Sequence, residues 1–469
     1  MAVIQPGLER IGQLLKNVQF PWKSIHVAGT NGKGSICHYA SSLLTHRRIK
    51  CGKFTSPHLV DRWDCIYINE KPVDETLFRK VETHYAQLSQ KENINASSFE
   101  ILTATAFHIF NEEEVQVGVV EVGMGGKLDS TNILNNQVVS IISKIAYDHQ
   151  RFLGDTIEEI ALHKAGILKS NTPYAFNPLN SKSVQAVINQ YAKEVGAGRR
   201  LDEKTLELET SLFSEKDWQE FAKPLQSFQR DNAILAIIAV KEAVKSLGID
   251  FSDAEIAGTL MSLRGKPNPG RLQYLQVQPV FGNPNDPGRD ILIDGAHNPD
   301  AANALANFIL EKERQRKTGN TPSGSERPVT WVLAMTEGKD ARQYLEILLK
   351  PGDKVVTTSF GPIDGMPWVK SMDPKELFTT AKAVQPNITG LYIPERGAFR
   401  ALSAAKSLTD DENPIVLTGS LYLVGDFHRE LRTRNEQAWW TDSEHKADRS
   451  NMKRIHEVEQ QRVRQMLSQ

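Results

Sequence analysis

Residues 24–44 read SIHVAGTNGKGSICHYASSLL, and this stretch decides the fold. The short run Ser24–Ala28 predicts a buried strand, and the apolar residues after the glycines recur at the spacing of a helix. A strand, a glycine loop and a helix in this order cradle a phosphate. Glycine lets backbone N–H groups turn toward the anion, and the helix N-terminus carries a partial positive charge. The stretch therefore predicts a phosphate-binding loop in a parallel α/β domain.

The loop supplies the groups that a nucleotide phosphate needs. Lys33 can reach the outer phosphates, and a loop hydroxyl can ligate Mg²⁺. The loop departs from the common P-loop pattern, because Gly34 separates Lys33 from Ser35 and Val27 stands where a glycine is usual. A tight turn without a ligand is the alternative. We expect a nucleotide to contact the whole loop: Gly29, Thr30, Asn31, Gly32, Lys33, Gly34 and Ser35.

Chain length and composition limit the classes of protein that this sequence can form. A chain of 469 residues is long enough for two or three domains, and its net charge of −1 offers no general attraction to nucleic acid or an anionic membrane. Cys37, Cys51 and Cys65 lack metal-ligand spacing, so we expect buried thiols in a reducing compartment. No apolar run approaches the ~20 residues that span a bilayer, and the first residues show no secretory or transit pattern. We expect a cytosolic protein without nucleic-acid or membrane partners.

The loop GTNGKGS resembles the ATP loop of the Mur ligases and, through GKGS, that of the folylpolyglutamate synthase/dihydrofolate synthase family. Further motifs of this family follow in order along most of the chain. The resemblance implies an N-terminal P-loop-type, Mur ligase-like domain with a parallel sheet. The alternation of strands and helices in the last third predicts a C-terminal Rossmann-like α/β domain. We expect these domains over residues 1–277 and 290–428, a linker at 278–289 and a charged helical tail at 429–469.

Glu121 is the first of three expected metal ligands. A carboxylate in the apolar run VGVVEVG is costly to bury unless it is paired or bound to a cation, and Mg²⁺ is the natural partner close to a phosphate loop. The family resemblance implies the same role for Glu121, and it adds Ser56 of the SPH loop and His149 of the Asp148–His149 pair. It implies ATP and two Mg²⁺ ions. The chain departs from the family after the SPH loop, where residues 61–65 read DRWDC.

Lys164 lies in a predicted helix from Thr156 to Lys169, with Thr156 as its cap and Lys169 in its last turn. Its segment IALHKAGI resembles the family's IAxEKAGI, with His163 in place of glutamate. The resemblance implies that Lys164 is the lysine that the family carbamylates with CO₂. This reaction needs a neutral amine, and burial favours one by lowering the pKa of a lysine. A surface lysine on a helix is the alternative.

Other motifs imply substrate contacts. The SSFE segment resembles a family patch beside the pterin, so Ser97 and Phe99 are candidates, although an aromatic at a buried helix start more often belongs to the core. Ser97 or Ser98 should cap the following helix. The segment LDS resembles the family's pterin-binding residues, Leu128, Asp129 and Ser130. The opening GLERIGQLL resembles the segment that borders the pterin, or is a helix that covers the core.

The remaining candidates lie in the second half of the chain. Asn232 resembles the family's ATP-contacting asparagine, and it could instead cap the helix predicted at 228–247. Arg271, in PGR, resembles an arginine on the ATP phosphates. Asp294 and His297, in DGAHNP, resemble a motif that acts on ATP and the incoming amino acid. Asn298 or Asp300 could cap the next helix.

The resemblance implies an ATP-dependent amide ligation through an acyl phosphate, with Lys33, Lys164, Asp294 and His297 as catalytic residues. The expected substrates are dihydropteroate, L-glutamate and ATP, and we expect a monomer. We favour dihydrofolate synthase because the chain starts directly at GLERIGQLL and FTSPHLVDRWDCIYINEK resembles the fungal enzymes. Folylpolyglutamate synthase, an enzyme with both activities, and a non-catalytic ATP-binding regulator are the alternatives.

Overall fold

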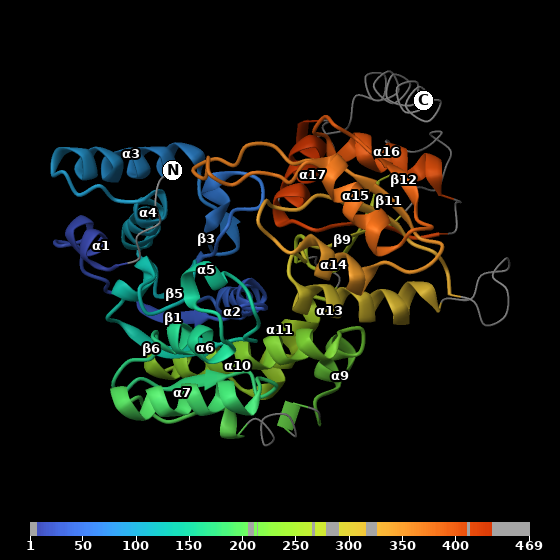
Figure 1. Cartoon of the computed structure of the whole chain (residues 1–469). Coiled ribbons are helices and arrows are strands. Elements are labelled where there is room, and N and C mark those ends of the chain that lie inside the picture. The colour runs from blue at the N-terminus through green and yellow to red at the C-terminus, as the bar shows by residue number, and fades with distance from the viewer. Residues whose placement is uncertain are drawn as a thin grey trace. The chain divides into compact units, whose positions relative to one another are not determined.

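The computed structural model describes residues 7–204, 211–264 apart from 213, 268–277, 290–315, 326–409 and 413–433. The chain forms two compact units, Met1–Lys266 and Pro267–Gln469. Both are parallel α/β units, as predicted (Figure 1). Among the helices in these ranges, none combines the length and the apolar character needed to cross a bilayer.

The first unit is built on a seven-stranded sheet in the order β4-β3-β2-β5-β1-β6-β7. Strands β2, β5, β1, β6 and β7 run parallel to one another. Strands β3 and β4 form an antiparallel hairpin at one edge. The predicted strand is β1, near the middle of the sheet. The strands are β1 (Lys23–Ala28), β2 (Cys51–Phe54), β3 (Ile66–Ile68), β4 (Lys71–Pro72), β5 (Val117–Glu121), β6 (Gln137–Ile142) and β7 (Tyr174–Phe176).

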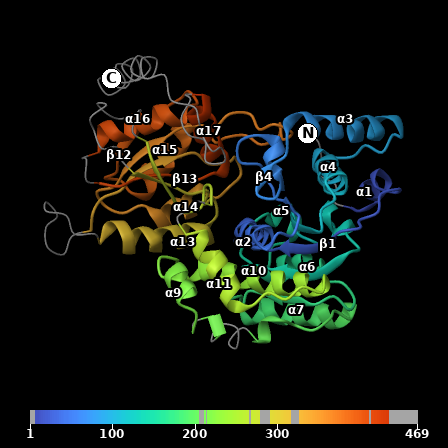
Figure 2. The same ribbon diagram turned by 180° about the vertical axis from the view of Figure 1, so that it is seen from behind.

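Helices cover both faces of this sheet. The first face packs on α2 (Lys33–His46), α10 (Ser227–Ser246) and α11 (Asp253–Ser262), which lie together in the view from behind (Figure 2). The other face packs on α1 (Glu9–Leu14), α3 (Glu75–Lys91) and α4 (Ser98–Glu112) toward β2, and on α6 (Ile157–Ala165) and α7 (Lys182–Val195) toward β7. The shorter helices are α5 (Gln150–Leu153) and α9 (Lys216–Ala222), and the 3₁₀ turns are Arg62–Cys65, Ser130–Ile133 and Asp202–Lys204.

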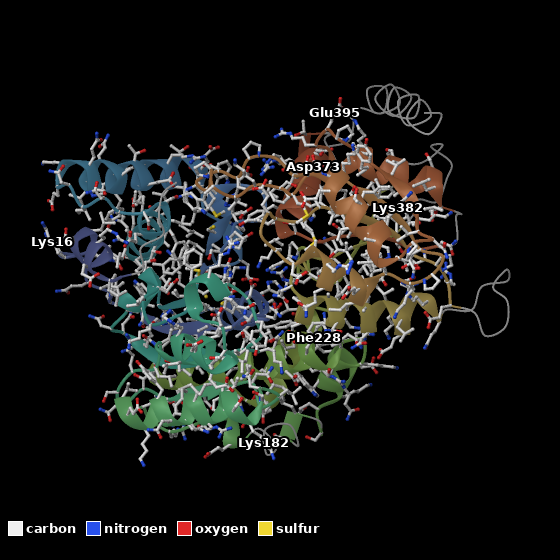
Figure 3. The ribbon with its side chains drawn as sticks, in the orientation of Figure 1. Lys16, Lys182, Phe228, Asp373, Lys382 and Glu395 are labelled. Carbon is white, nitrogen blue, oxygen red and sulfur yellow. The ribbon has the colours of Figure 1, made fainter. Side chains whose placement is uncertain are left out.

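The alternation of buried side chains follows from the strand period of two. In β1, Ile25 and Val27 pack on α2 and α10, whereas His26 and Ala28 face the opposite side. The three cysteines are buried and form no disulfide, as predicted. Lys16 and Lys182 are exposed and lie at the periphery of the unit (Figure 3).

The second unit has a six-stranded sheet in the order β12-β11-β10-β13-β9-β8. The run from β12 to β13 has the doubly wound order of a Rossmann-like sheet, and β8 pairs antiparallel with β9 at the edge. The strands are β8 (Gln273–Gln276), β9 (Asp290–Ile293), β10 (Thr330–Leu333), β11 (Lys354–Thr357), β12 (Thr389–Tyr392) and β13 (Ile415–Thr418).

The helices of this unit also lie on two faces (Figure 1). The first face packs on α13 (Pro299–Ile309), α14 (Ala341–Leu348) and α15 (Pro374–Val384), and the other on α16 (Ala398–Leu408) and α17 (Leu421–Thr433). A π-helical turn, Leu310–Arg314, extends α13. Asn298 caps α13 by accepting from Ala301 N at 2.9 Å, which confirms one of the two predicted caps.

Several boundaries differ from the sequence expectation. The helix that carries Lys164 ends at Ala165, so Lys169 lies beyond its last turn; Gly166 follows, where a Cβ would lie 2.3 Å from Lys127 Cβ. The units divide before Pro267 and not after residue 277, because β8 belongs to the second sheet. The expected linker at 278–289 lies outside the described residues. So does the expected tail beyond Thr433, and residues 429–433 complete α17.

Candidate active site

The phosphate loop leaves the carboxyl end of β1, between β5 and β6. Gly32 takes a left-handed conformation, with φ of 94°, and is the residue from which α2 begins. The first N–H groups of a helix have no partner within it, so the start of α2 presents donors and a partial positive charge. Strand, loop and helix thus have the predicted arrangement.

Two glycines of the loop are required by close contacts. At Gly29, with φ of 144°, a Cβ would lie 1.8 Å from Ser143 Oγ on the extension of β6. At Gly32 a Cβ would lie 2.4 Å from Asn232 Oδ1. Asn232 is buried in the sixth position of α10, whose N-cap is Gln226, so the capping interpretation of Asn232 is wrong. The structure instead places its carboxamide against the phosphate loop.

The backbone N–H groups of Thr30 and Asn31 donate to a neighbouring segment of the protein. Thr30 N and Asn31 N both donate to Lys144 O, at 2.8 and 3.1 Å. The hydroxyl of Thr30 donates to Ala146 O at 3.0 Å. These groups are therefore engaged within the protein, and Thr30 braces the loop. Its predicted contact with a nucleotide stays a prediction.

Glu121 is the last residue of β5 and lies beside the loop, as predicted. Its carboxylate is buried, and Oε1 is 3.6 Å from Lys33 Nζ. A Cβ on Gly34 would lie 3.6 Å from Oε2, so the carboxylate reaches the start of α2. Lys33 Nζ also donates to Thr30 O at 3.2 Å. A lysine and a carboxylate thus meet at the start of α2.

Lys164 reaches the same loop from α6. Its side chain is buried, and Nζ donates to Gly29 O at 2.8 Å. Burial first, and then the charge of Lys33, lower its pKa from 10.5 to about 7, against smaller opposing effects of Asp148 and Asp129. A large fraction of this amine is therefore neutral near neutral pH. The surface-lysine alternative is wrong.

Of the two other predicted metal ligands, His149 is exposed and Ser56 is half-buried. His149 has a left-handed backbone, φ of 55°, and its Nε2 is 3.9 Å from Asp148 Oδ2. Ser56 follows β2 and precedes Pro57. Within the described ranges, no group of three or more His, Cys, Asp and Glu side chains is arranged to hold a metal ion. A cation on Glu121 would need further oxygen ligands, which serine, phosphate and water can supply.

The predicted substrate residues before α4 have structural partners. Ser97 caps α4 through Glu100 N at 3.2 Å, as predicted, and Glu100 Oε2 accepts from Ser97 N at 2.7 Å. Phe99 stacks on Phe54 with ring centroids 6.1 Å apart, and it fills the space beside Gly123. These contacts favour the core interpretation of Phe99, and its role toward a pterin stays a prediction.

The LDS segment contains one exposed residue and two buried residues whose side chains are hydrogen-bonded. Leu128 is 41% exposed and free to meet a ligand. Ser130 Oγ lies 2.7 Å from Thr103 Oγ1, both buried. Asp129 accepts from Met124 N and Thr131 N at 2.8 and 3.0 Å, so its carboxylate shapes the loop that follows Glu121.

A hydrogen-bond chain that the sequence analysis missed runs from β1 to Asp129. Thr131 Oγ1 lies 2.5 Å from Asp129 Oδ1 and 2.9 Å from His26 Nε2. The single hydroxyl proton goes to the carboxylate, so Nε2 must carry the ring proton and donate to Thr131. Burial lowers the pKa of His26 to about 3, and the ring stays neutral.

Thr131→Val should therefore destabilise the protein. The substitution keeps the shape but leaves the buried Nε2–H of His26 unpaired and removes a donor from Asp129, which costs roughly 2 kcal/mol of unfolding free energy. Urea unfolding measures this cost. Thr105→Val is the matched control, because the buried hydroxyl of Thr105 donates to Ile101 O of its own helix. Equal losses of unfolding free energy in the two variants would contradict the proposed hydrogen-bond chain from His26 to Asp129.

The second unit gathers its own predicted residues at the carboxyl end of β9. Asp294 is buried and accepts from Leu272 N and Ala296 N, both at 2.8 Å. Burial raises its pKa, and the charges of Arg271 and then His297 oppose that rise. A Cβ on Gly295 would lie 2.6 Å from Arg271 Nη1, so glycine admits the guanidinium. Arg271, Asp294 and His297 thus form one group, in which Asp294 fixes the PGR turn.

Two protein-family models match the chain. The "Mur ligase middle domain" covers residues 27–221, and the "Dihydrofolate synthetase, C-terminal domain" covers residues 281–432. A phosphate loop on a parallel sheet, followed by this second domain, defines the class of the protein. It is an ATP-dependent ligase of the Mur ligase type.

The relatives narrow the class. The chain is 36% identical to a protein named probable dihydrofolate synthetase of Schizosaccharomyces pombe, over 92% of this chain and 99% of the relative. It is 34% identical to the dihydrofolate synthetase of Saccharomyces cerevisiae, over 91% and 98%. A folylpolyglutamate synthase of Mycobacterium tuberculosis, solved with ADP and AMPPCP, matches with a TM-score of 0.71 and 26% identity, over 92% and 96%. The chain belongs to the dihydrofolate synthase/folylpolyglutamate synthase family.

Proposed function

We propose that the protein is a dihydrofolate synthase, which joins the amino group of L-glutamate to the carboxyl group of 7,8-dihydropteroate and converts ATP to ADP and phosphate. The observation that carries this proposal is the match, along nearly the whole chain, with two fungal relatives named for that activity. The site geometry supports phosphoryl transfer, because Lys33, the start of α2 and Glu121 meet at one loop.

The reaction starts when the carboxylate of dihydropteroate attacks the γ-phosphorus of ATP, which gives an acyl phosphate and ADP. The amine of glutamate then attacks the acyl carbon, and phosphate leaves with the oxygen that bridged carbon and phosphorus. The role of Lys33 is to hold negative charge on the phosphoryl oxygens while they transfer. The N–H groups at the start of α2 add to this stabilisation, since they point where the phosphate binds.

The Glu121 carboxylate fits a divalent cation. Glu121 is a buried carboxylate beside the phosphate loop, and carboxylates are the ligands that Mg²⁺ prefers. We assign Glu121, Ser56 and His149 to two Mg²⁺ ions, completed by phosphate oxygens and water. The bound ions would neutralise charge on the phosphates.

Lys164 is proposed to be carbamylated. Its neutral amine attacks CO₂: a C–N bond forms, one C=O π bond passes its electron pair to oxygen, and the N–H proton goes to solvent. A pKa of about 7 makes the neutral amine available without a separate base. The product is a carboxylate near Lys33, where its charge is compensated.

Other assignments are also proposals. Asn232 and the phosphate loop bind ATP, and Ser97, Phe99, Leu128, Asp129 and Ser130 border the pterin. In the second unit, Arg271 binds the ATP phosphates, and Asp294 and His297 act on ATP and the incoming glutamate. We propose a monomer in the cytosol, and three buried cysteines without a disulfide support the reducing compartment.

Product analysis tests the proposal. The protein is incubated with ATP, Mg²⁺, glutamate and either dihydropteroate or tetrahydrofolate, and phosphate and the folate product are measured. We expect phosphate release and dihydrofolate with dihydropteroate. Turnover with tetrahydrofolate alone would assign folylpolyglutamate synthase, turnover with both would assign the enzyme with both activities, and no turnover would favour the regulator.

A further inference from the structure

The extension of β6 at residues 143–146 holds the phosphate loop by its backbone. Lys144 O accepts from Thr30 N and Asn31 N. Ala146 N donates to Thr30 Oγ1 at 3.1 Å, and Ala146 O accepts from the same hydroxyl. The conformation of the phosphate loop therefore depends on this segment keeping its extended shape.

The opposite edge of this segment is held by one side chain. Asn180 is buried, its Oδ1 accepts from Ile145 N at 2.8 Å, and its Nδ2 donates to Ser143 O at 3.2 Å. In a parallel ladder, one residue donates to a carbonyl and accepts from the N–H two residues further along the neighbouring strand. The carboxamide of Asn180 reproduces this pattern.

The Asn180 side chain continues the hydrogen-bond ladder because strand β7 ends before it reaches the level of residues 143–145. β7 pairs with β6 as far as Phe176 opposite Ile142, and Asn177 N still donates to Ile142 O at 2.9 Å. Pro178 follows, which has no N–H and turns the chain away from the sheet. Asn180 then reaches back and continues the ladder past the end of β7.

A second contact fixes the same two segments. Lys144 Nζ donates to Leu179 O at 2.6 Å. The segment 177–180 therefore grips Lys144 from its side chain and, through Asn180, from both neighbouring peptide groups. The other edge of the segment faces the phosphate loop, where the Lys144 carbonyl accepts from Thr30 N and Asn31 N.

We propose that Asn180 is a positioning residue for the phosphate loop. It holds residues 143–145 extended, so that the Lys144 carbonyl stays where the loop needs it before a nucleotide arrives. Without these two bonds, nucleotide binding must also order the segment, which weakens affinity. The inference rests on the proposed function only in that the loop binds a nucleotide, whichever acceptor receives the phosphate.

Asn180→Asp tests this role. The substitution keeps the size and the acceptor toward Ile145 N, but it sets a carboxylate oxygen against Ser143 O. We expect the Kd for MgADP, measured by calorimetry on the full chain, to rise about 10-fold. The KM for ATP should rise with it, while the KM for glutamate stays within about two-fold. A role in stability alone would lower the melting temperature and leave both nucleotide constants unchanged.

Asn136→Asp is the matched control. Asn136 bridges β1 and β6 at their amino ends: its Oδ1 accepts from Ser24 Oγ at 2.9 Å, and its Nδ2 donates to Trp22 O. The substitution makes the same clash with a carbonyl, far along β1 from the phosphate loop. We expect a lower melting temperature and a Kd for MgADP within about two-fold of the wild type.

The outcomes separate the two proposals. A folded Asn180→Asp protein that binds MgADP like the wild type overturns the positioning role alone, as does an equal loss in Asn136→Asp. A wild-type protein that does not bind MgADP overturns the proposed function as well. If Asn180→Asp does not fold, Asn180→Ser, which leaves room for a water, takes its place. Failure of both to fold would overturn the proposal, because the carboxamide would then hold the fold itself.

Discussion

Glu121→Gln should nearly abolish turnover, by about 1,000-fold, in a protein that remains folded. The amide keeps the size of the side chain but removes the charge that faces Lys33 across 3.6 Å and would ligate the cation. Steady-state phosphate release measures the effect, and a Mg²⁺ titration should show a higher concentration for half-maximal activity. A melting temperature close to that of the wild type would show that the fold survives.

Glu70→Gln is the matched control for this substitution. Glu70 is half-buried in the first unit, and it accepts from Ser41 Oγ at 2.6 Å and from Ser42 Oγ. Because it lies on the hairpin between β3 and β4, its loss should lower stability and spare turnover. Near-normal activity of Glu121→Gln would refute its assignment as a cation ligand.

Lys164→Met should remove activity and yet stabilise the protein. Burial makes the charged amine unfavourable in the folded state, so an apolar side chain of similar length relieves a cost of a few kcal/mol. The lost hydrogen bond to Gly29 O offsets about 1 kcal/mol of this gain. Turnover and the free energy of unfolding, measured on one preparation, test both parts.

The pH dependence of this stability gain follows from the lowered pKa of Lys164. The pKa of Lys164 is about 7 in the folded state and 10.5 as the unperturbed value, so between these pH values the unfolded chain binds more protons. The lysine's cost is therefore fully present below pH 7 and fades as the pH rises toward 10.5. The stability advantage of Lys164→Met should grow as the pH falls from 10 to 7 and then level off.

Lys169→Met controls for the loss of a lysine. Lys169 is partly buried and donates to Asn132 O at 3.2 Å, outside the phosphate loop. We expect activity within about two-fold of the wild type. A Lys164→Met protein that keeps its activity, or that is less stable than the wild type at every pH, would contradict the assignment of Lys164 as a buried, reactive amine.

The sequence predicted the elements whose signals are local. The strand, glycine loop and helix of residues 24–44 form as expected, because apolar periodicity and glycine conformation are written in consecutive residues. Glu121 was found because a carboxylate in an apolar run needs a partner, and it lies at the loop. The resemblance implied a carbamylated Lys164, a reaction that favours a buried amine, and the structure buries this side chain against the phosphate loop.

Features that depend on distant partners could not be read in this way. Asn180 lies in NPLNS, which reads as a turn, and its partners are 35 and 37 residues away. His26 looks like one polar residue in a strand until the fold brings Thr131 beneath it. The boundary before Pro267 depends on β8 pairing with β9 across an intervening segment. Strand pairing and side-chain contact, rather than local pattern, decide these features.

The most direct test of the central claim, that ATP activates the carboxylate of dihydropteroate, follows an oxygen atom. Dihydropteroate labelled with oxygen-18 in its carboxyl group is converted with ATP, Mg²⁺ and glutamate, and the released phosphate is examined by mass spectrometry. An acyl phosphate transfers one labelled oxygen to each phosphate, and we expect that label in the phosphate. Dihydrofolate formed together with unlabelled phosphate would contradict the account.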